Sequence, residues 1–182
     1  MEEEIKQEIK LNFGCGGNRL PGWVNMDWEV NIEKPLPFPD DHADFILIEH
    51  CLEHVPIQSA YNFLVESKRI LKKGGILRVA VPSVVQIHKM ENDNYRSFIK
   101  RQGWGTGERG CGVHAITFQH GHQIWFSREV LEAVMQSIGF RTLQLEVHES
   151  IRPQLQNVEG HHRMIGEENN SIDTIVVEGE KV

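Results

Sequence analysis

Two glycines and one carboxylate give the clearest chemical signal in this 182-residue sequence. Gly14, Cys15 and Gly16 follow a short apolar run, and Asp27 ends the next apolar stretch eleven positions after Gly16. Glycine lets the main chain turn sharply and approach a ligand, and a carboxylate can bind the paired hydroxyls of a ribose. In open α/β sheets such groups meet at the carboxyl ends of the strands. The pattern predicts a nucleotide-like ligand, with a plain turn between two strands as the alternative.

The spacing argues against a dinucleotide. A dinucleotide fingerprint would have a third glycine where Arg19 stands, and its acidic residue would come about 20 positions later. Pro21 and Gly22 also interrupt the stretch, so any first helix is a turn or two long and offers no full helix N-terminus to a pyrophosphate. A ligand with a ribose but no phosphate fits better, and S-adenosylmethionine is such a ligand.

Histidines supply the candidate catalytic bases, and the sequence has ten of them. His50 follows a predicted strand, whereas His120 and His122 precede a helix predicted from Ser127. A neutral imidazole can take a proton from an acceptor group. We therefore name His50, His120 and His122 as catalytic candidates, against the alternative that they are polar side chains of surface loops.

One histidine pattern admits metal-based alternatives. His50-Cys51-Leu52-Glu53-His54 fits the His-x-x-Glu-His motif of inverted zinc proteases. That motif needs a helix around His50, whereas the preceding residues 45–48 have the composition of a strand, so the favoured interpretation assigns no metal ligand. Two alternatives stay open: a zinc hydrolase, and a divalent ion held by His50, Glu53, His54 and a later histidine such as His122.

Composition limits the class of protein further. A net charge of −7 argues against a general nucleic-acid surface, which needs a basic face. No apolar run approaches the roughly 20 residues of a membrane helix. Three cysteines without a Cys-x-x-Cys pair make a disulfide framework unlikely and favour the cytoplasm. We expect one domain over residues 1–182, and the sequence leaves open whether it forms a homodimer.

Strand-like and helix-like segments alternate along the chain. Predicted strands cover residues 9–13, 23–27, 43–48, 76–81, 143–147 and 172–178. Predicted helices cover residues 56–73, a region near 84–101, and 127–139. A long polar stretch, residues 149–171, is predicted as a functional or mobile loop. This order predicts a mostly parallel sheet with helices on its faces and an antiparallel pair of strands at one edge.

The sequence resembles class I S-adenosylmethionine-dependent methyltransferases, with the closest likeness to a small bacterial group of type 11-like predicted methyltransferases. The resemblance depends on the order and spacing of several blocks rather than on any one of them. They are Leu11 to Gly16, Leu20 to Asp27, Lys34 to Asp40, Asp44 to Ile46, Leu52 to Val55, Arg69 to Gly75 and Ile138 to Phe140.

The resemblance implies a Rossmann-like, doubly wound α/β fold with seven strands, the last antiparallel, and S-adenosylmethionine as cofactor. It implies that Gly14 and Gly16, with Cys15 between them, approach the methionine end of the cofactor. The other cofactor-binding positions that it implies are Asp27 for the ribose, Trp28 and Asn31 for the adenine, and Glu49 and His50 beside the methionine.

The activity expected from the resemblance is methyl transfer to an oxygen or nitrogen of a small-molecule or glycan-like acceptor. Transfer from a sulfonium releases a neutral thioether, so the enzyme needs alignment more than acid catalysis. A cofactor-binding module without turnover is the main alternative.

Overall fold

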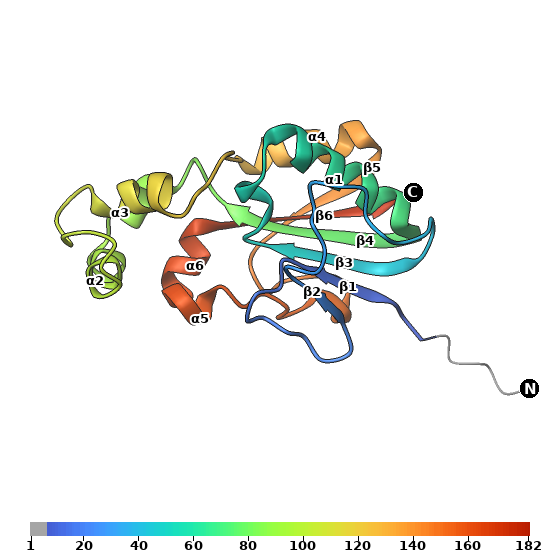
Figure 1. Ribbon diagram of the computed structural model, residues 1–182, viewed down its shortest axis with the longest axis horizontal. Coiled ribbons are helices and arrows are strands. Elements are labelled where there is room, and N and C mark those ends of the chain that lie inside the picture. The colour runs from blue at the N-terminus through green and yellow to red at the C-terminus, as the bar shows by residue number, and fades with distance from the viewer. Residues whose placement is uncertain (1–6) are drawn as a thin grey trace, which may run out of the picture.

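The fold is built on one mixed sheet (Figure 1). The computed structural model describes residues 7–182, so the first six residues of the predicted domain lie outside the described part. Within that range the sheet has six strands in the order β2-β1-β3-β4-β6-β5. Their bounds are β1 (Lys10–Phe13), β2 (Val24–Met26), β3 (Ala43–Glu49), β4 (Leu71–Pro82), β5 (Phe140–Leu145) and β6 (Thr174–Lys181). Strands β1 to β4 are parallel, and β6 is antiparallel to both β4 and β5. The predicted Rossmann-like sheet with an antiparallel last strand is confirmed.

The strand count differs from the expected seven. The chain between β2 and β3 forms turns instead of a further strand, one of them closed by a 3.1 Å bond from Lys34 N–H to Asn31 O. Three prolines follow within residues 35–39. Proline has no N–H to donate to a strand ladder, so this segment cannot extend the sheet beyond β2.

One face of the sheet is apolar and carries the main core. Side chains alternate between the two faces of a strand, so every second residue points toward this core. They include Leu11, Phe13, Ile46, Ile48, Leu77, Val79, Val81, Ile175 and Val177. Helices α1 (Ile57–Ile70) and α4 (Arg128–Ile138) contact each other and cover this face (Figure 1).

The observed ends of these two helices can be compared with the ends predicted from the sequence. Helix α4 begins and ends as predicted, because Ser127 Oγ accepts the Val130 N–H at 3.2 Å and Gly139 is left-handed with φ 94°. Helix α1 ends at Ile70, three residues before the predicted end. Leu71 is already extended and pairs with β3, so the residues up to Gly74-Gly75 belong to β4.

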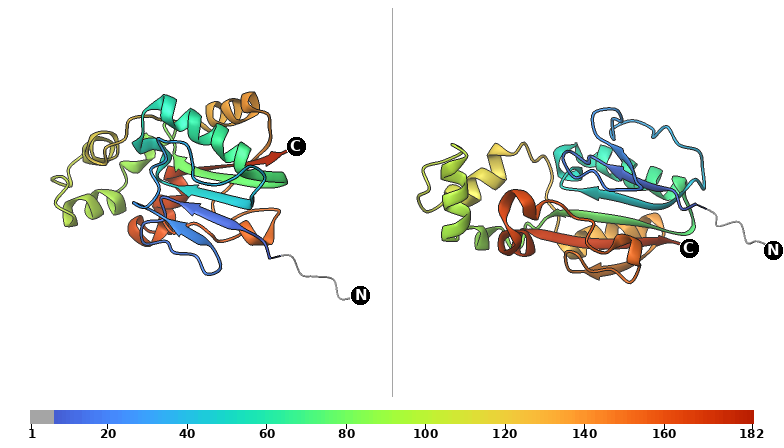
Figure 2. Two further views of the ribbon diagram at one scale, coloured as in Figure 1. Left: turned by 45° about the vertical axis from the view of Figure 1, so that its right-hand side comes forward. Right: turned by 90° about the horizontal axis from the view of Figure 1, so that it is seen from below.

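The opposite face of the sheet has a buried ion cluster at its centre. Arg78 of β4 is fully buried and faces Glu178 of β6 directly across the ladder, with 2.7 Å from Nη1 to Oε1. Its Nε donates to the buried Glu159, and its Nη1 also donates to the Glu149 carbonyl at 2.7 Å. Glu149 and Glu159 lie in the connection between β5 and β6, which runs over this face (Figure 2). The short helix η4 (Pro153–Leu155) of that connection adds Leu155 to a small apolar cluster there.

A helical lobe lies between β4 and α4, at the carboxyl end of β4 (Figures 1 and 2). It contains η2 (Ile87–Met90), α2 (Asp93–Arg101), α3 (Cys111–His114) and a π-helical turn, η3 (Ala115–Gln119). The single helix predicted near 84–101 is thus two helices. The predicted loop at 149–171 contains helices too: besides η4, it includes α5 (His162–Ile165) and most of α6 (Glu167–Asp173). Ile165 of α5 packs into the core of the lobe, which joins the two regions.

Candidate functional site

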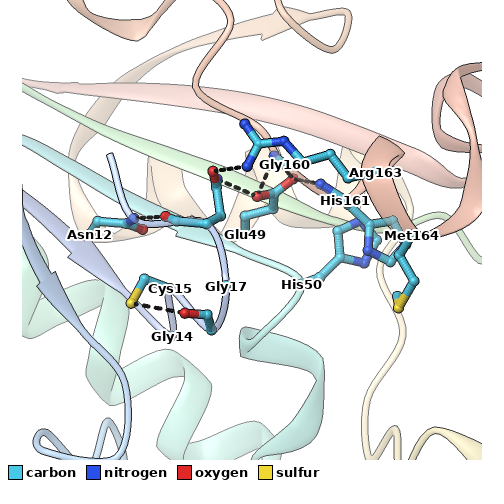
Figure 3. A pocket seen from close by; sticks show the side chains of 12 residues that line it. Asn12, Gly14, Cys15, Gly17, Glu49, His50, Gly160, His161, Arg163 and Met164 are labelled. Atoms are coloured by element: carbon cyan, nitrogen blue, oxygen red, sulfur yellow. Dashed lines mark hydrogen bonds between the residues drawn. The ribbon is translucent and has the colours of Figure 1, made fainter. Parts of the chain in front are cut away.

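A cavity of about 430 Å³ opens where β1 and β3 end (Figure 3). Its wall comes from the glycine turn after β1, the end of β3, and the connection between β5 and β6. The lining residues are Asn12, Gly14, Cys15, Gly16, Gly17, Asn18, Glu49, His50, Gly160, His161, Arg163 and Met164. The volume is in the range of sites that hold small organic molecules. The cavity lies at the edge of the sheet that the sequence indicated.

The glycines of the turn serve two different purposes. Gly14 has φ 62°, and a Cβ there would lie 2.4 Å from the Cys51 Sγ, so this glycine allows close packing inside the protein. Gly16 has φ 44°, and a Cβ on Gly16 or on Gly17 would meet nothing within 4 Å. The main chain of Gly16 and Gly17 is therefore the part of the turn that a ligand can approach.

Asparagine side chains, rather than a following helix, hold this turn in position. Asn12 Nδ2 donates to the Asn18 carbonyl and to Asn25 Oδ1, both at 2.9 Å, which ties the turn to β2. Asn18 Nδ2 donates to the Val158 carbonyl at 2.8 Å and to Glu49 Oε2 at 3.1 Å. These bonds fix the turn against both neighbouring segments before any ligand binds.

Glu49 joins the end of β3 to a distant part of the chain. Its carboxylate accepts the N–H groups of Gly160 and His161 at 2.8 Å, 111 and 112 positions away (Figure 3). A Cβ on Gly160 would lie 2.5 Å from Asn18 Cγ, so glycine is needed for this approach. Burial raises the pKa of Glu49, and the two backbone donors oppose that rise. Sequence reasoning missed Gly160, His161 and Arg163 as site residues, and the one available signal was the long polar stretch that contains them.

The predicted cofactor-binding residues divide into two groups. Those that line the cavity are Gly14, Cys15, Gly16, Glu49 and His50. Those outside its lining are Asp27, Trp28 and Asn31.

The second group lies around the end of β2. Trp28 is 95% exposed, and Asn31 Oδ1 accepts the Glu33 N–H at 2.9 Å. Asp27 follows β2 directly, and its main-chain N–H donates to Glu29 Oε2 at 2.8 Å. The roles assigned to these residues in cofactor binding stay predictions.

A second cavity of about 170 Å³ adjoins the first, between the end of the sheet and the helical lobe. The two cavities share His50, His161 and Met164. The second is lined in addition by Glu53, His54, Pro82, Tyr95, Ile116, His120, His122, Ile165 and Asp173. The structure thus brings the three predicted catalytic histidines, His50, His120 and His122, to one cavity beside the candidate cofactor cavity.

Burial controls the charge of these histidines. It lowers the pKa of His50 to about 3 and the pKa of His122 to about 4, so both imidazoles are neutral near pH 7. The His50 ring stacks on His161 with centroids 3.6 Å apart, and its Nε2 bonds to Thr174 Oγ1 at 2.8 Å. Burial also raises the pKa of the Asp173 carboxyl to about 7. His50 and His122 therefore present neutral nitrogen atoms to the second cavity.

The structure does not support the zinc hydrolase alternative in the form that the sequence suggested. His50 has a left-handed φ of 45° directly after β3, and only the three residues of η1 (Leu52–His54) are helical. His50 and His54 therefore do not share one face of an α-helix, as the inverted zinc motif requires.

Comparison with known sequences points to one family. Residues 17–79, about a third of the chain, match the family described as a methyltransferase domain. Demethylmenaquinone methyltransferases from two strains of Tropheryma whipplei are 39% identical over 62 residues. That match covers 34% of this chain and 25% of each relative, so the matched segment spans a quarter of the relatives' length.

Similar folds occur in solved structures over nearly the whole chain. An S-adenosylmethionine-dependent methyltransferase from Mesorhizobium loti has a TM-score of 0.56 at 12% identity, covering 98% of this chain and 93% of that one. A possible histamine N-methyltransferase from Thermotoga maritima has a TM-score of 0.53 at 20% identity, covering 98% and 84%. The [4+2]-cyclase SpnF has a TM-score of 0.52 at 14% identity, covering 97% and 76%. At these identities the likeness is one of fold.

The chain has the fold of class I S-adenosylmethionine-dependent methyltransferases, and residues 17–79 match their methyltransferase domain in sequence. The resemblance inferred from the sequence blocks is confirmed. Because a protein named as a cyclase shares this fold, the reaction must be argued from the site. Within residues 7–182, no helix has the length and apolar character needed to span a membrane.

Proposed function

We propose that this protein is an S-adenosylmethionine-dependent methyltransferase that acts on an oxygen or nitrogen of a small-molecule or glycan-like acceptor. The observation that carries the proposal is the 430 Å³ cavity over the bare main chain of Gly16 and Gly17. A cofactor without phosphate needs no helix N-terminus, and the described chain between β1 and β2 has none. The match of residues 17–79 to the methyltransferase domain supports the same cofactor.

The residues around the first cavity fit such a cofactor. A ligand can approach the main chain of Gly16 and Gly17 closely, because no side chain covers it. Glu49 and Arg163 place groups of opposite charge at the cavity wall. Those charges suit the amino and carboxylate groups of an amino acid. Asp27, at the end of β2, is the proposed partner of the ribose hydroxyls.

The second cavity is the proposed acceptor site because it adjoins the first through His50, His161 and Met164. Bound S-adenosylmethionine would supply an activated methyl group, whose transfer would leave the neutral thioether S-adenosylhomocysteine. The protein's own task is to hold the acceptor in line with that group and to remove at most one proton. His120 and His122 line the acceptor side and are the proposed proton acceptors, and His50 stands between the two cavities.

Binding of S-adenosylhomocysteine tests the cofactor site by calorimetry. Gly17→Val directs a branched side chain into the open space above the turn, at a residue without positive φ, and should abolish binding. Ala133→Val places the same branched side chain on an exposed part of α4 and should leave binding unchanged. Asp27→Asn should weaken binding about tenfold or more if the carboxylate holds the ribose. Wild-type protein that fails to bind, or Gly17→Val protein that binds normally, would overturn the proposal.

The main alternative is a module that binds the cofactor without turnover. The intact glycine turn and Asp27 are common to both possibilities, so the discriminating measurement is slow conversion of the cofactor in the presence of a metabolite extract. Tight binding without any conversion would favour the module. We propose the cytoplasm as the location, since all three cysteines are free thiols.

A further inference from the structure

Three potential metal ligands converge on one point of the second cavity. Glu53 Oε1 lies 3.7 Å from His54 Nε2 and 3.9 Å from His122 Nε2. One ligand atom from each of the three residues lies within 4.8 Å of the other two. Glu53 and His54 end the short helix η1, whereas His122 comes from the segment before α4.

The carboxylate of Glu53 has no hydrogen-bond partner among residues 7–182, although only 1% of its side chain is exposed. The side-chain nitrogens of three histidines lie within 4 Å of it, those of His54 and His122 and the Nδ1 of His50 at 3.5 Å, and none of them forms a hydrogen bond to it. Arg78 satisfies the buried carboxylates of Glu159 and Glu178, whereas Asp173 Oδ1, which lines the same cavity as Glu53, also lacks a hydrogen-bond partner within residues 7–182. Burying a carboxylate without a donor or cation is costly, so this arrangement indicates a cationic partner.

The backbone holds the three side chains together from segments far apart in the sequence. The N–H groups of Gln123 and Ile124 donate to the Glu53 carbonyl at 2.8 and 3.3 Å. The side-chain amide of Gln123 donates to the His54 carbonyl at 2.6 Å, and Leu52 anchors η1 in the main core. The position of His122 beside Glu53 and His54 is therefore fixed by hydrogen bonds of its neighbours Gln123 and Ile124, and not by contacts among the three ligand side chains.

We propose that Glu53, His54 and His122 bind a divalent transition-metal ion, with Zn²⁺ as the expected ion. Bonds of about 2.1 Å in a tetrahedron put neighbouring ligand atoms roughly 3.4 Å apart. The two separations from Glu53 Oε1, 3.7 and 3.9 Å, are longer than this by about half an ångström or less, and the two imidazole ligand atoms lie within 4.8 Å of each other. Two imidazoles and one carboxylate favour zinc over Mg²⁺ or Ca²⁺, which prefer oxygen ligands. Three protein ligands leave one position open, and the cavity supplies the space for it.

This ligand set retains Glu53, His54 and His122 of the divalent-ion alternative left open by the sequence and omits His50, which the inverted zinc motif would also require. The Nε2 of His50 is bonded to Thr174, and its ring stacks on His161 at the boundary between the two cavities. A His122 nitrogen that binds zinc cannot also accept a proton, so in the zinc-bound protein His120 is the remaining candidate for that role at the acceptor side. Metal binding itself does not require the proposed methyltransferase activity. Zinc binding and S-adenosylhomocysteine binding can each succeed or fail without the other.

The test measures Zn²⁺ and Co²⁺ binding to chelator-treated full-length protein. The wild type should bind one Zn²⁺ per chain in competition with a chromogenic chelator, and Co²⁺ should give the visible absorption bands of a four-coordinate site. His122→Ala and Glu53→Gln should each weaken zinc binding by more than the roughly 10–100-fold that follows loss of an outer-shell partner. The matched control is His162→Ala, because His162 lies in a separate His148–His162–Glu167 cluster.

Thermal unfolding separates loss of ligands from loss of fold. Metal-free Glu53→Gln protein should melt no lower than the metal-free wild type, because the change removes an unpaired buried charge. Added Zn²⁺ should raise the melting temperature of the wild type and of His162→Ala, but not of Glu53→Gln. The proposal is overturned if the wild type binds no zinc, if both ligand variants bind it normally, or if His162→Ala is the variant that loses it.

Discussion

The two faces of the central sheet are built in opposite ways (Figure 2). The apolar face is packed by α1 and α4 through many similar contacts among aliphatic and aromatic side chains. The other face depends on a few polar groups that each hold specific partners, such as Arg78 with Glu159 and Glu178, and Glu49 with Gly160. An apolar core tolerates small changes in volume, whereas a buried ion that loses its partner is left in a low-dielectric environment. The ligand cavity is therefore supported by the face of the sheet that tolerates substitutions less well.

The largest expected effect follows from Arg78→Met. The change leaves Glu159 and Glu178 buried without their cation, and breaking such a cluster on one side costs about 3–5 kcal/mol. Urea unfolding followed by circular dichroism measures the loss. The triple variant Arg78→Met, Glu159→Gln, Glu178→Gln should recover much of it, because no unpaired charge remains. A loss below about 1 kcal/mol in the single variant would contradict the comparison.

A smaller effect is expected from Gly14→Ala, where the glycine turn meets the apolar side. The new Cβ would lie 2.4 Å from Cys51 Sγ at a residue with positive φ, so we expect a loss of about 2 kcal/mol. In a Cys51→Gly background the collision disappears and only the backbone strain remains. The same substitution should then cost about 1 kcal/mol less, as a double-mutant cycle of urea unfolding experiments would show. An equal loss of unfolding free energy in both backgrounds would show that contact with Cys51 is not the reason why position 14 requires glycine.

Gly160→Ala tests the polar side of the same turn. Its Cβ would lie 2.5 Å from Asn18 Cγ, so the connection must move away from the cavity and weaken the bonds to Glu49. We expect S-adenosylhomocysteine binding to weaken about tenfold, which is 1.4 kcal/mol, with a smaller change in global stability. Calorimetry and thermal unfolding measure the two quantities. A variant that loses stability but keeps full affinity would show that the connection is not part of the binding site.

The smallest effect is expected from Ile48→Val on the apolar face. Ile48 is fully buried, and removal of one methylene from a core side chain costs about 0.5–1.5 kcal/mol. Affinity for S-adenosylhomocysteine should not change, although residue 48 is only two positions before His50. Thermal unfolding measures the loss of stability, and calorimetry measures the affinity for S-adenosylhomocysteine. A clear loss of affinity would mean that the apolar face also shapes the cavity.

The sequence by itself determined the elements whose signals are local. Short apolar runs predicted strands such as β1 and β3, and Ser127 and Gly139 predicted both ends of α4. The glycine turn after β1 was also predictable, because few other residues accept its backbone angles. Such signals operate between neighbours in the chain, so they can be seen without the fold.

Only the tertiary structure decided the partners on the polar face and in the two cavities. Nothing near Arg78 in the sequence indicates that it is fully buried, because its partners lie 81 and 100 positions away. Likewise, Glu49 meets Gly160 and Glu53 meets His122 only because the connection between β5 and β6 and the segment before α4 return to the end of β3. Contacts of this kind depend on the path of the whole chain, which local patterns do not specify.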